Sequence, residues 1–182
     1  MKKRLHKCLK PLPFLNICTH ILLTWYYQLS IMQNTAPKQR QWPALSFQDW
    51  KDTLATVHLW TQIVGKIRLR KMPWLNHSWH VTLYVTPDGL STGSVPYQHG
   101  IFQIDFNFMQ HQLIIITSMG KRDTVALKPR TVADFYRELF DKLAALDIDV
   151  SIYGMPSEIE GAIPFEEDRL HQSYDAAKME DF

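Results

Sequence analysis

The chain has 182 residues, 46% hydrophobic and 21% charged, a composition that excludes disordered and fibrous classes and fits one soluble globular domain. The net charge of +2 is unevenly distributed, because residues 1–31 hold five of the 20 lysines and arginines and none of the 18 acids. From Met32 onward, 15 basic residues stand against 18 acidic ones, a net charge of −3, which lacks the basic excess of a nucleic-acid-binding protein.

Residues 1–31 begin with basic residues and continue with a loosely apolar stretch. We expect an upstream extension that precedes a start at Met32; a secretory signal or membrane anchor and a genuine structural element are the alternatives. Prolines and polar residues interrupt the apolar stretch, whereas a membrane-spanning helix needs about 20 apolar residues, and no good cleavage site follows it. Both cysteines, Cys8 and Cys18, lie in this extension, so the rest of the chain uses no disulfide and suits a reducing cytoplasm.

The first predicted element is a helix that begins after Ser46, which forms a capping box with Asp49. Apolar residues recur at steps of three and four between Phe47 and Ile67 and form one broad face. Other apolar residues lie outside this face, so we expect a central buried helix rather than a surface helix.

After Pro73 the apolar period changes to two, which predicts a strand over residues 79–86 and a turn at Pro87–Gly89. The same alternation predicts three more strands, over residues 102–108, 113–117 and 124–127. A short connection between the first two of these three strands predicts that they form a hairpin.

Thr131 and Asp134 form a second capping box, which opens an amphipathic helix over residues 132–146. A last short strand is expected over residues 149–153. Beyond Gly154, about twenty residues have no sustained period, and a segment of this kind is usually a functional loop, here one that covers the domain. These elements predict an α+β fold in which an antiparallel sheet of four to five strands packs against two helices, in the order helix, four strands, helix, strand and covering loop.

A candidate pocket lies between the first helix and the first strand. His58 and Gln62 form a polar patch at the edge of the helix's apolar face, and the polar face of the strand offers His80 and Tyr84 as partners. A pocket floored by His58, Gln62 and His80 would be apolar with a few convergent polar groups, as small-ligand sites usually are. Its walls would be three tryptophans, Trp60, Trp74 and Trp79. The competing interpretation, which the sequence supports equally, is that these groups only satisfy one another across a helix–sheet interface.

The stretch WLNHSWH, from Trp74 to His80, raises the question of a metal-binding or catalytic pair of histidines. On a strand, residues an odd number apart face opposite sides, so His77 and His80 converge only if Asn76 and His77 belong to a turn. For either histidine, we favour a structural role, in which the ring is hydrogen-bonded, over a functional one. We therefore treat Asn76 and His77 as candidate ligand contacts beside the pocket and not as metal ligands.

The late loop contributes Glu158 as a candidate ligand contact and His171 as a third candidate acid–base group, beside His58 and His80. Acidic side chains of this loop could complete a metal site with a histidine, but such acids are more often solvated. The chain has none of the HExxH, CxxC, GxSxG, Walker or GxGxxG motifs. We therefore expect no metal site, and the sequence leaves any cofactor open.

Six longer motifs occur in chain order: TLATVHLWTQIVGK, PWLNHSWHVTLYVT, FQIDFNFMQHQL, TVADFYRELFDKLAALDIDV, PSEIEGAIPF and DRLHQSYD. Together they resemble a bacterial family defined only as a domain of unknown function, numbered 5996. The resemblance runs from Trp42 to about Asp175, implies no activity, and supports a start at Met32 with one domain over residues 32–182. Members usually continue into a second, aromatic-rich half, so the resemblance implies a truncated member in which a site shared between halves would be incomplete. Asp147 stands where a glycine is common in the family, a difference that affects helix capping more than chemistry.

Two functional hypotheses follow. The first is a small-ligand-binding or enzymatic domain with a His/Trp-lined pocket and the late loop as a lid, its ligand and reaction open. The second is a non-catalytic scaffold or protein-interaction module in which the tryptophans are core residues and a second half or subunit covers an exposed face, which would favour a homo-oligomer. Under either hypothesis we expect a cytoplasmic protein with neither a nucleic-acid nor a membrane partner.

Overall fold

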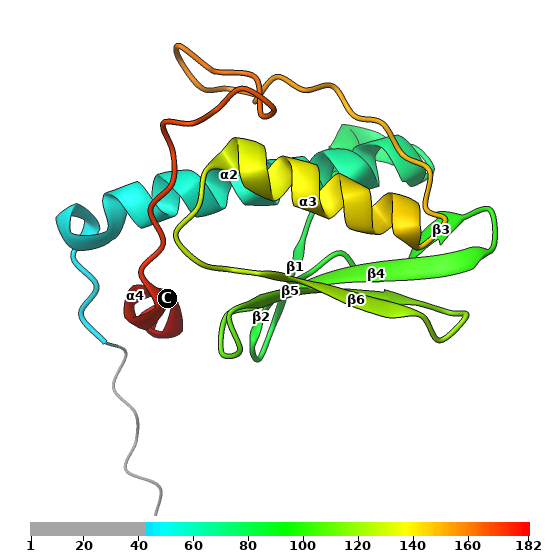
Figure 1. Cartoon of the computed structure of the whole chain (residues 1–182), viewed down its shortest axis with the longest axis horizontal. Coiled ribbons are helices and arrows are strands. Elements are labelled where there is room, and N and C mark those ends of the chain that lie inside the picture. Colours follow the sequence, from blue (N-terminus) through cyan, green and yellow to red (C-terminus); the bar gives the residue numbers. More distant parts are fainter. Residues whose placement is uncertain (1–42) are drawn as a thin grey trace, which may run out of the picture. The chain divides into compact units, whose positions relative to one another are not determined.

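The computed structural model describes residues 43–182, and the expectations about residues 1–31 lie outside this part of the chain. In the described part, two helices lie on one face of a six-stranded antiparallel sheet (Figure 1). The predicted α+β class, with an antiparallel sheet packed against two helices, is therefore confirmed. The number and order of the strands differ from the prediction.

Helix α2 (Phe47–Lys71) is the central helix that the apolar spacing predicts. Trp60 and Ile63 are fully buried, and the helix buries residues on several sides. Helix α3 (Val132–Ala145), strand β3 (Val95–Tyr97) and the turn that follows α2 all contact it. The side chain of Ser46 makes no capping bond. Instead, the backbone N–H of Asp49 donates to the Ser46 carbonyl at 3.0 Å, so the first predicted capping box is absent.

The sheet has the strand order β1-β2-β4-β5-β6, and β3 pairs with the start of β4 while β2 pairs with its end. The strands are β1 (Tyr84–Thr86), β2 (Gly89–Ser91), β3 (Val95–Tyr97), β4 (Gly100–Asn107), β5 (Gln112–Thr117) and β6 (Arg122–Ala126). Gly89 opens β2 with a φ of 152°, and a Cβ there would lie 1.9 Å from the Phe106 carbonyl oxygen. Only glycine fits at this close approach of two strands.

Helix α3 (Val132–Ala145) is amphipathic and begins as predicted, because the Thr131 hydroxyl accepts the Asp134 N–H at 3.1 Å. Its buried face meets the inner face of the sheet, and its Phe135 stacks on Trp60 with ring centroids 4.7 Å apart. Fully buried side chains of the sheet complete this core, namely Phe102, Ile104, Phe106, Leu113, Ile115 and Val125. Both helices and the sheet therefore share one hydrophobic core.

The strand predicted over residues 79–86 is wrong for its first half, which forms the 3-10 helix η1 (Asn76–Val81). Trp79, His80 and Val81 alternate between apolar and polar as in a strand, but they continue a turn that begins with left-handed φ values of 54° and 58° at His77 and Ser78. The short strands β2 and β3 were not predicted, because three residues are too few to show a period.

The strand predicted over residues 149–153 is also wrong, since this segment pairs with no strand. The alternation of Val150 and Ile152 reflects an irregular segment with one side packed on the core. A short helix, α4 (Ala176–Asp181), was not predicted.

Residues 154–175 form a covering loop, as predicted, which runs over the helix layer and then descends to α4 (Figure 1). The loop is fastened to the domain because Phe165 is fully buried, and within the loop the Phe165 N–H donates to the Gly154 carbonyl at 2.9 Å. A compact loop with its ends held in this way is of the kind that often carries function. No helix within residues 43–182 is long and apolar enough to cross a membrane.

Candidate functional site

A groove of about 450 Å³ runs along the side of α2 that the core does not cover. Its wall on α2 repeats at three- and four-residue steps, so one stripe of the helix faces the groove. The opposite side comes from η1, the segment before β1, and β2. The lining residues are His58, Thr61, Gln62, Gly65, Lys66, Leu69, Val81, Leu83, Leu90 and Ser157. Gly65 faces Val81 across the groove, where an added Cβ would lie 3.6 Å from a Val81 methyl group, an ordinary van der Waals distance.

The covering loop is clamped over this groove by Gln62. Its side-chain amide donates to the Ser157 carbonyl at 3.0 Å and accepts the Ser157 N–H at 2.8 Å, as a paired strand would. Lys66 adds a third bond from Nζ to the Ser157 hydroxyl oxygen at 3.0 Å, and His58 Nε2 lies 3.3 Å from Gln62 Nε2. Polar groups thus gather at the loop side of the groove, while aliphatic side chains form the rest of it.

A second hollow of about 440 Å³ continues from the first, since both are lined by Lys66 and Leu69. Arg70 and three loop residues, Ser151, Ile152 and Tyr153, complete it. Lys66 Nζ lies 5.6 Å from the centre of the Tyr153 ring, within the range of a cation–π contact. We call the two hollows together the α2 groove.

Within residues 43–182, the cations of the α2 groove have no carboxylate partner in an ion pair. None of the ion pairs found within residues 43–182 includes Lys66 or Arg70. Partial burial lowers the pKa of Lys66, because the ammonium group loses hydration that no negative charge replaces. The groove therefore combines an aliphatic floor with an electropositive lip.

A family model described as a family of unknown function, DUF5996, matches residues 42–182. The chain belongs to the DUF5996 family. The matched residues include both long helices, the sheet and the covering loop, so the whole α2 groove lies inside the DUF5996 domain. No curated protein and no solved structure matches the chain.

Of the residues that the sequence assigned to a pocket, the structure brings His58 and Gln62 together in the α2 groove. His80 lies elsewhere: it is buried, its Nδ1 accepts the Leu75 N–H at 3.2 Å, and its carbonyl accepts the Arg68 Nε–H at 2.8 Å. Trp60 is a core residue, stacked between Phe135 and Tyr174. Neither His80 nor Trp60 lines the groove.

The other predicted contacts surround η1 and not the groove. Trp74 and Trp79 are 69% and 68% exposed, and Asn76, His77 and Tyr84 are exposed as well. His77 is in a turn, which was the condition for the two histidines to converge. Its ring nevertheless lies beside that of Trp79, with centroids 6.3 Å apart and the planes tilted by 42°, while His80 packs beside Trp74. The two histidines therefore do not converge. Glu158 is exposed and follows Ser157 in the covering loop.

His171 belongs to a second, separate polar cluster. Its Nδ1 lies 2.8 Å from Asp168 Oδ2, and the buried Asp168 also accepts the backbone N–H groups of Leu170 and His171. The carbonyls of Asp168 and His171 in turn accept N–H groups from the first turn of α3. His171 does not line the α2 groove. The hydrogen bonds of this cluster instead fasten the loop to α3.

A further histidine network holds the C-terminal segment. His111 Nδ1 lies 3.0 Å from the Tyr174 hydroxyl, and its Nε2 lies 3.3 Å from Glu180. Burial raises the pKa of Tyr174 to about 12, so its hydroxyl stays protonated and keeps the hydrogen bond with His111 Nδ1 at neutral pH. In the described residues there is no group of three or more His, Cys, Asp or Glu side chains placed to hold a metal ion.

Sequence reasoning missed the groove residues Lys66, Arg70 and Ser157. A signal for the two cations was present, because no Asp or Glu occurs between Thr53 and Thr86 although four lysines and arginines do. Ser157 had no such signal, since it meets Gln62 across 95 positions of the chain.

Proposed function

We propose that this DUF5996 domain binds a small organic anion with an apolar body in the α2 groove. The observation that carries the proposal is the pairing of an aliphatic floor with Lys66 and Arg70, two cations without a carboxylate partner in the described structure. Small-ligand sites are typically hollows of about 300–1,000 Å³, mostly apolar, with a few placed polar groups. The α2 groove has this composition and this size.

Different residues of the groove would contact the apolar body and the negative group of the ligand. Leu69, Val81 and Leu83 would cover the apolar body, and burial of that body supplies affinity. The Lys66 ammonium and the Arg70 guanidinium would meet the negative group, which restores the interactions that the ammonium loses on burial. His58 is the imidazole that lines the groove, so an enzymatic version of the site would use it as the acid–base group.

Thermal unfolding of the full chain with a panel of organic anions tests the proposal, with alkyl carboxylates, aryl carboxylates and alkyl phosphates as probes. A ligand present at 100 times its Kd stabilises the folded state by about 2.7 kcal/mol, which raises Tm by several degrees. Lys66→Gln and Arg70→Gln should each weaken this binding at least tenfold, whereas Lys51→Gln, an exposed lysine at the other end of α2, should not change it. Absence of any stabilising anion, or equal binding by the Arg70→Gln variant, would refute the proposal.

Proton uptake gives a second measurement of the same contact. Because burial lowers the pKa of Lys66 in the free protein, a bound anion should raise it again. Calorimetry in alkaline buffers of different ionisation enthalpy should therefore show protons taken up on binding. The Lys66→Gln variant should show no uptake, and an unchanged uptake in that variant would remove Lys66 from the site.

A further inference from the structure

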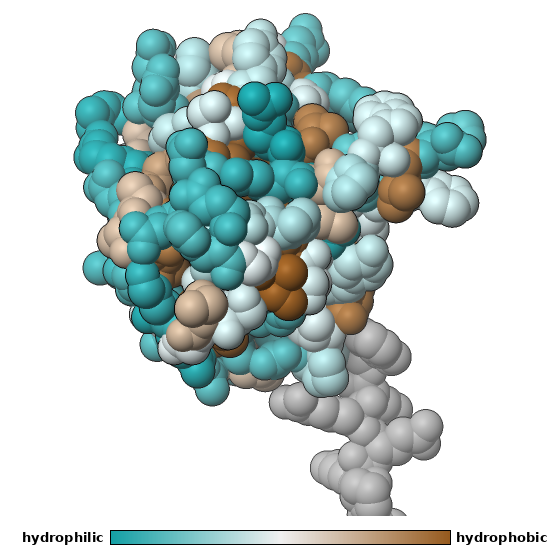
Figure 2. Space-filling model, turned by 90° about the vertical axis from the view of Figure 1, so that its right-hand side faces the viewer, coloured by the Kyte–Doolittle hydropathy of each residue, from teal (hydrophilic) through white to brown (hydrophobic). Residues whose placement is uncertain are grey.

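We propose that η1 and its flanking residues form a surface that docks onto the headgroup region of an anionic lipid bilayer. Trp74 and Trp79 are each about two-thirds exposed, Leu75 is 52% exposed, and Val85 on the neighbouring strand β1 is 86% exposed. A large side chain with that much exposed area projects from the surface, because neighbours in a hollow would cover it. Figure 2, which looks onto this end of the molecule, shows pale and brown side chains projecting beside teal ones at its right-hand edge.

The backbone that carries these side chains is held in place by specific contacts. His77 and Ser78 both take left-handed φ values, which cost roughly 1–2 kcal/mol for each residue other than glycine and persist only where the surroundings impose them. The buried Arg68 anchors the end of η1 to α2, since its Nε donates to the His80 carbonyl at 2.8 Å and its Nη1 donates to the Thr92 carbonyl. The Leu75 N–H donates to His80 Nδ1, and this hydrogen bond closes the turn. The tryptophans are therefore displayed by a defined turn.

Charge identifies the partner. From Thr53 to Thr86 the chain has no acidic residue, and Arg70 and Lys71 directly precede the exposed turn. This local positive charge stands out because the chain from Met32 onward has a net charge of −3. Tryptophan concentrates at membrane interfaces, and each lysine or arginine near an anionic leaflet adds to the attraction. Projecting tryptophans with aliphatic neighbours and a basic flank are the composition of an interfacial membrane contact.

Other occupants fit less well. A second copy that met the same surface would bring two basic flanks, each with Arg70 and Lys71, into one interface, and like charges across an interface are repulsive. Single-stranded RNA would stack on the tryptophans, but it would leave the exposed Leu75 and Val85 without an apolar partner. The sequence predicts no membrane partner because its apolar runs are short. Short apolar runs argue against a membrane-spanning helix, but they do not argue against a contact at the membrane surface.

Co-sedimentation of the full chain with vesicles tests the inference, using phosphatidylcholine alone and phosphatidylcholine mixed with phosphatidylserine. The mixed vesicles should bind the wild-type chain at least tenfold more tightly than the neutral ones. The double variant Trp74→Ala/Trp79→Ala should lose at least tenfold of the affinity for mixed vesicles, and Lys71→Gln should lose about fivefold, as expected for one basic residue near an anionic surface. Residues 1–31 carry five bases of their own, but all variants share them, so the differences isolate the η1 surface.

Matched controls lie at the other end of α2. Phe47 is 59% exposed and Lys51 is also exposed, so Phe47→Ala and Lys51→Gln should bind vesicles as the wild type does. The Tm of the tryptophan, Phe47 and Lys51 variants should stay at the wild-type value, because these side chains are exposed. Lys71 is half-buried, and Lys71→Gln keeps part of its aliphatic stem, so the Tm of this variant should change little. Neither tryptophan lines the α2 groove, so the double variant should keep its response to organic anions, and the two proposals fail separately.

Equal vesicle binding by the wild type and the double variant would overturn the inference. Two other results would also overturn it, each if the double variant leaves vesicle binding unaffected. The first is self-association, measured by sedimentation velocity, that the double variant abolishes. The second is binding of oligouridine that the double variant abolishes.

Discussion

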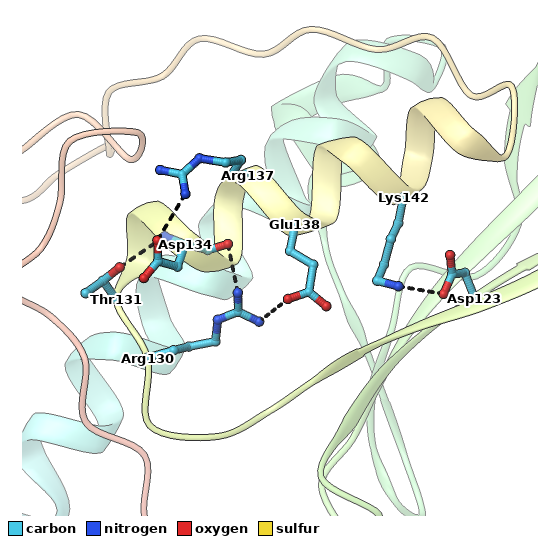
Figure 3. Close-up of polar contacts among 7 residues, drawn as sticks. All are labelled: Asp123, Arg130, Thr131, Asp134, Arg137, Glu138 and Lys142. Atoms are coloured by element: carbon cyan, nitrogen blue, oxygen red, sulfur yellow. Dashed lines mark hydrogen bonds and ion pairs between the residues drawn. The ribbon is translucent and has the colours of Figure 1, made fainter.

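The cations of the two long helices differ in what neutralises them. Beside α3, each of Arg130, Arg137 and Lys142 has a carboxylate oxygen within 3.2 Å (Figure 3). Along the second half of α2, none of the cations takes part in an ion pair of the described residues. A cation already paired with a carboxylate gains little from a ligand anion. The cations beside α3 are therefore structural, whereas those of α2 without an ion pair can bind an anion.

Within α2 the cations divide again. Arg68 is buried and uses carbonyl groups and the Tyr84 ring, 5.1 Å from its guanidinium carbon, as partners. Lys66 and Arg70 line the groove, and Lys71 lies at the helix end beside η1. The second half of α2 thus supplies one structural cation and three that face a groove or a surface.

The largest expected effect comes from the structural cation of α2. Arg68→Ala should destabilise the fold by about 3 kcal/mol or more, since it leaves the buried carbonyls of His80 and Thr92 without their donor and opens a cavity. Urea unfolding at equilibrium measures the change. Arg137→Ala, in an exposed pair on α3, should stay within about 0.5 kcal/mol of the wild type. Wild-type stability of the Arg68→Ala variant would contradict the role given to Arg68 in holding η1.

The next effect concerns the best-buried cation beside α3. Arg130 is 13% exposed, donates to Glu138 Oε2 at 2.6 Å and to the Asp134 carbonyl at 2.9 Å, and Arg130→Met should cost about 2 kcal/mol. A double-mutant cycle with Glu138→Gln should give a coupling of about 1 kcal/mol. If the cycle gives no coupling, the ion pairs of α3 are not structural and the contrast with α2 disappears.

Much of this fold follows from periodicity, which is reliable where an element is long. The apolar spacing locates α2 and α3, and alternation locates β4, β5 and β6, because each buries one regular face on the shared core. Periodicity fails at η1, since nothing in the residue types of His77 and Ser78 announces a left-handed conformation. It fails again at residues 149–153, where packing on the core imitates a strand.

Of the candidate site, the sequence predicts only the residues that helical spacing brings to one face of α2. His58 and Gln62 lie four residues apart on one stripe of α2, and both line the groove. Partners from distant segments could not be inferred, because their position depends on how the covering loop returns over α2. Tryptophan was a misleading signal, as Trp60 packs in the core while Trp74 and Trp79 are exposed beside η1.

The smallest expected effect is the acid sensitivity of the remaining α3 pair. The Lys142 ammonium, 2.8 Å from Asp123 Oδ1, and the Thr124 N–H hold the pKa of Asp123 below its usual value, against the opposing effect of burial. Because the folded pKa is the lower one, the folded state binds fewer protons than the unfolded state near that pH. The pair's contribution, about 0.5 kcal/mol for a partly exposed ion pair, is therefore complete above the unfolded pKa near 4 and is lost as the pH falls through the folded pKa. NMR titration of the Asp123 carboxyl group should show the lowered pKa in the wild type and a higher value in the Lys142→Met variant. Identical titrations in the two proteins would show that Lys142 is as free of carboxylate partners as the cations of α2, and the contrast between the helices would then rest on Arg130 and the exposed Arg137.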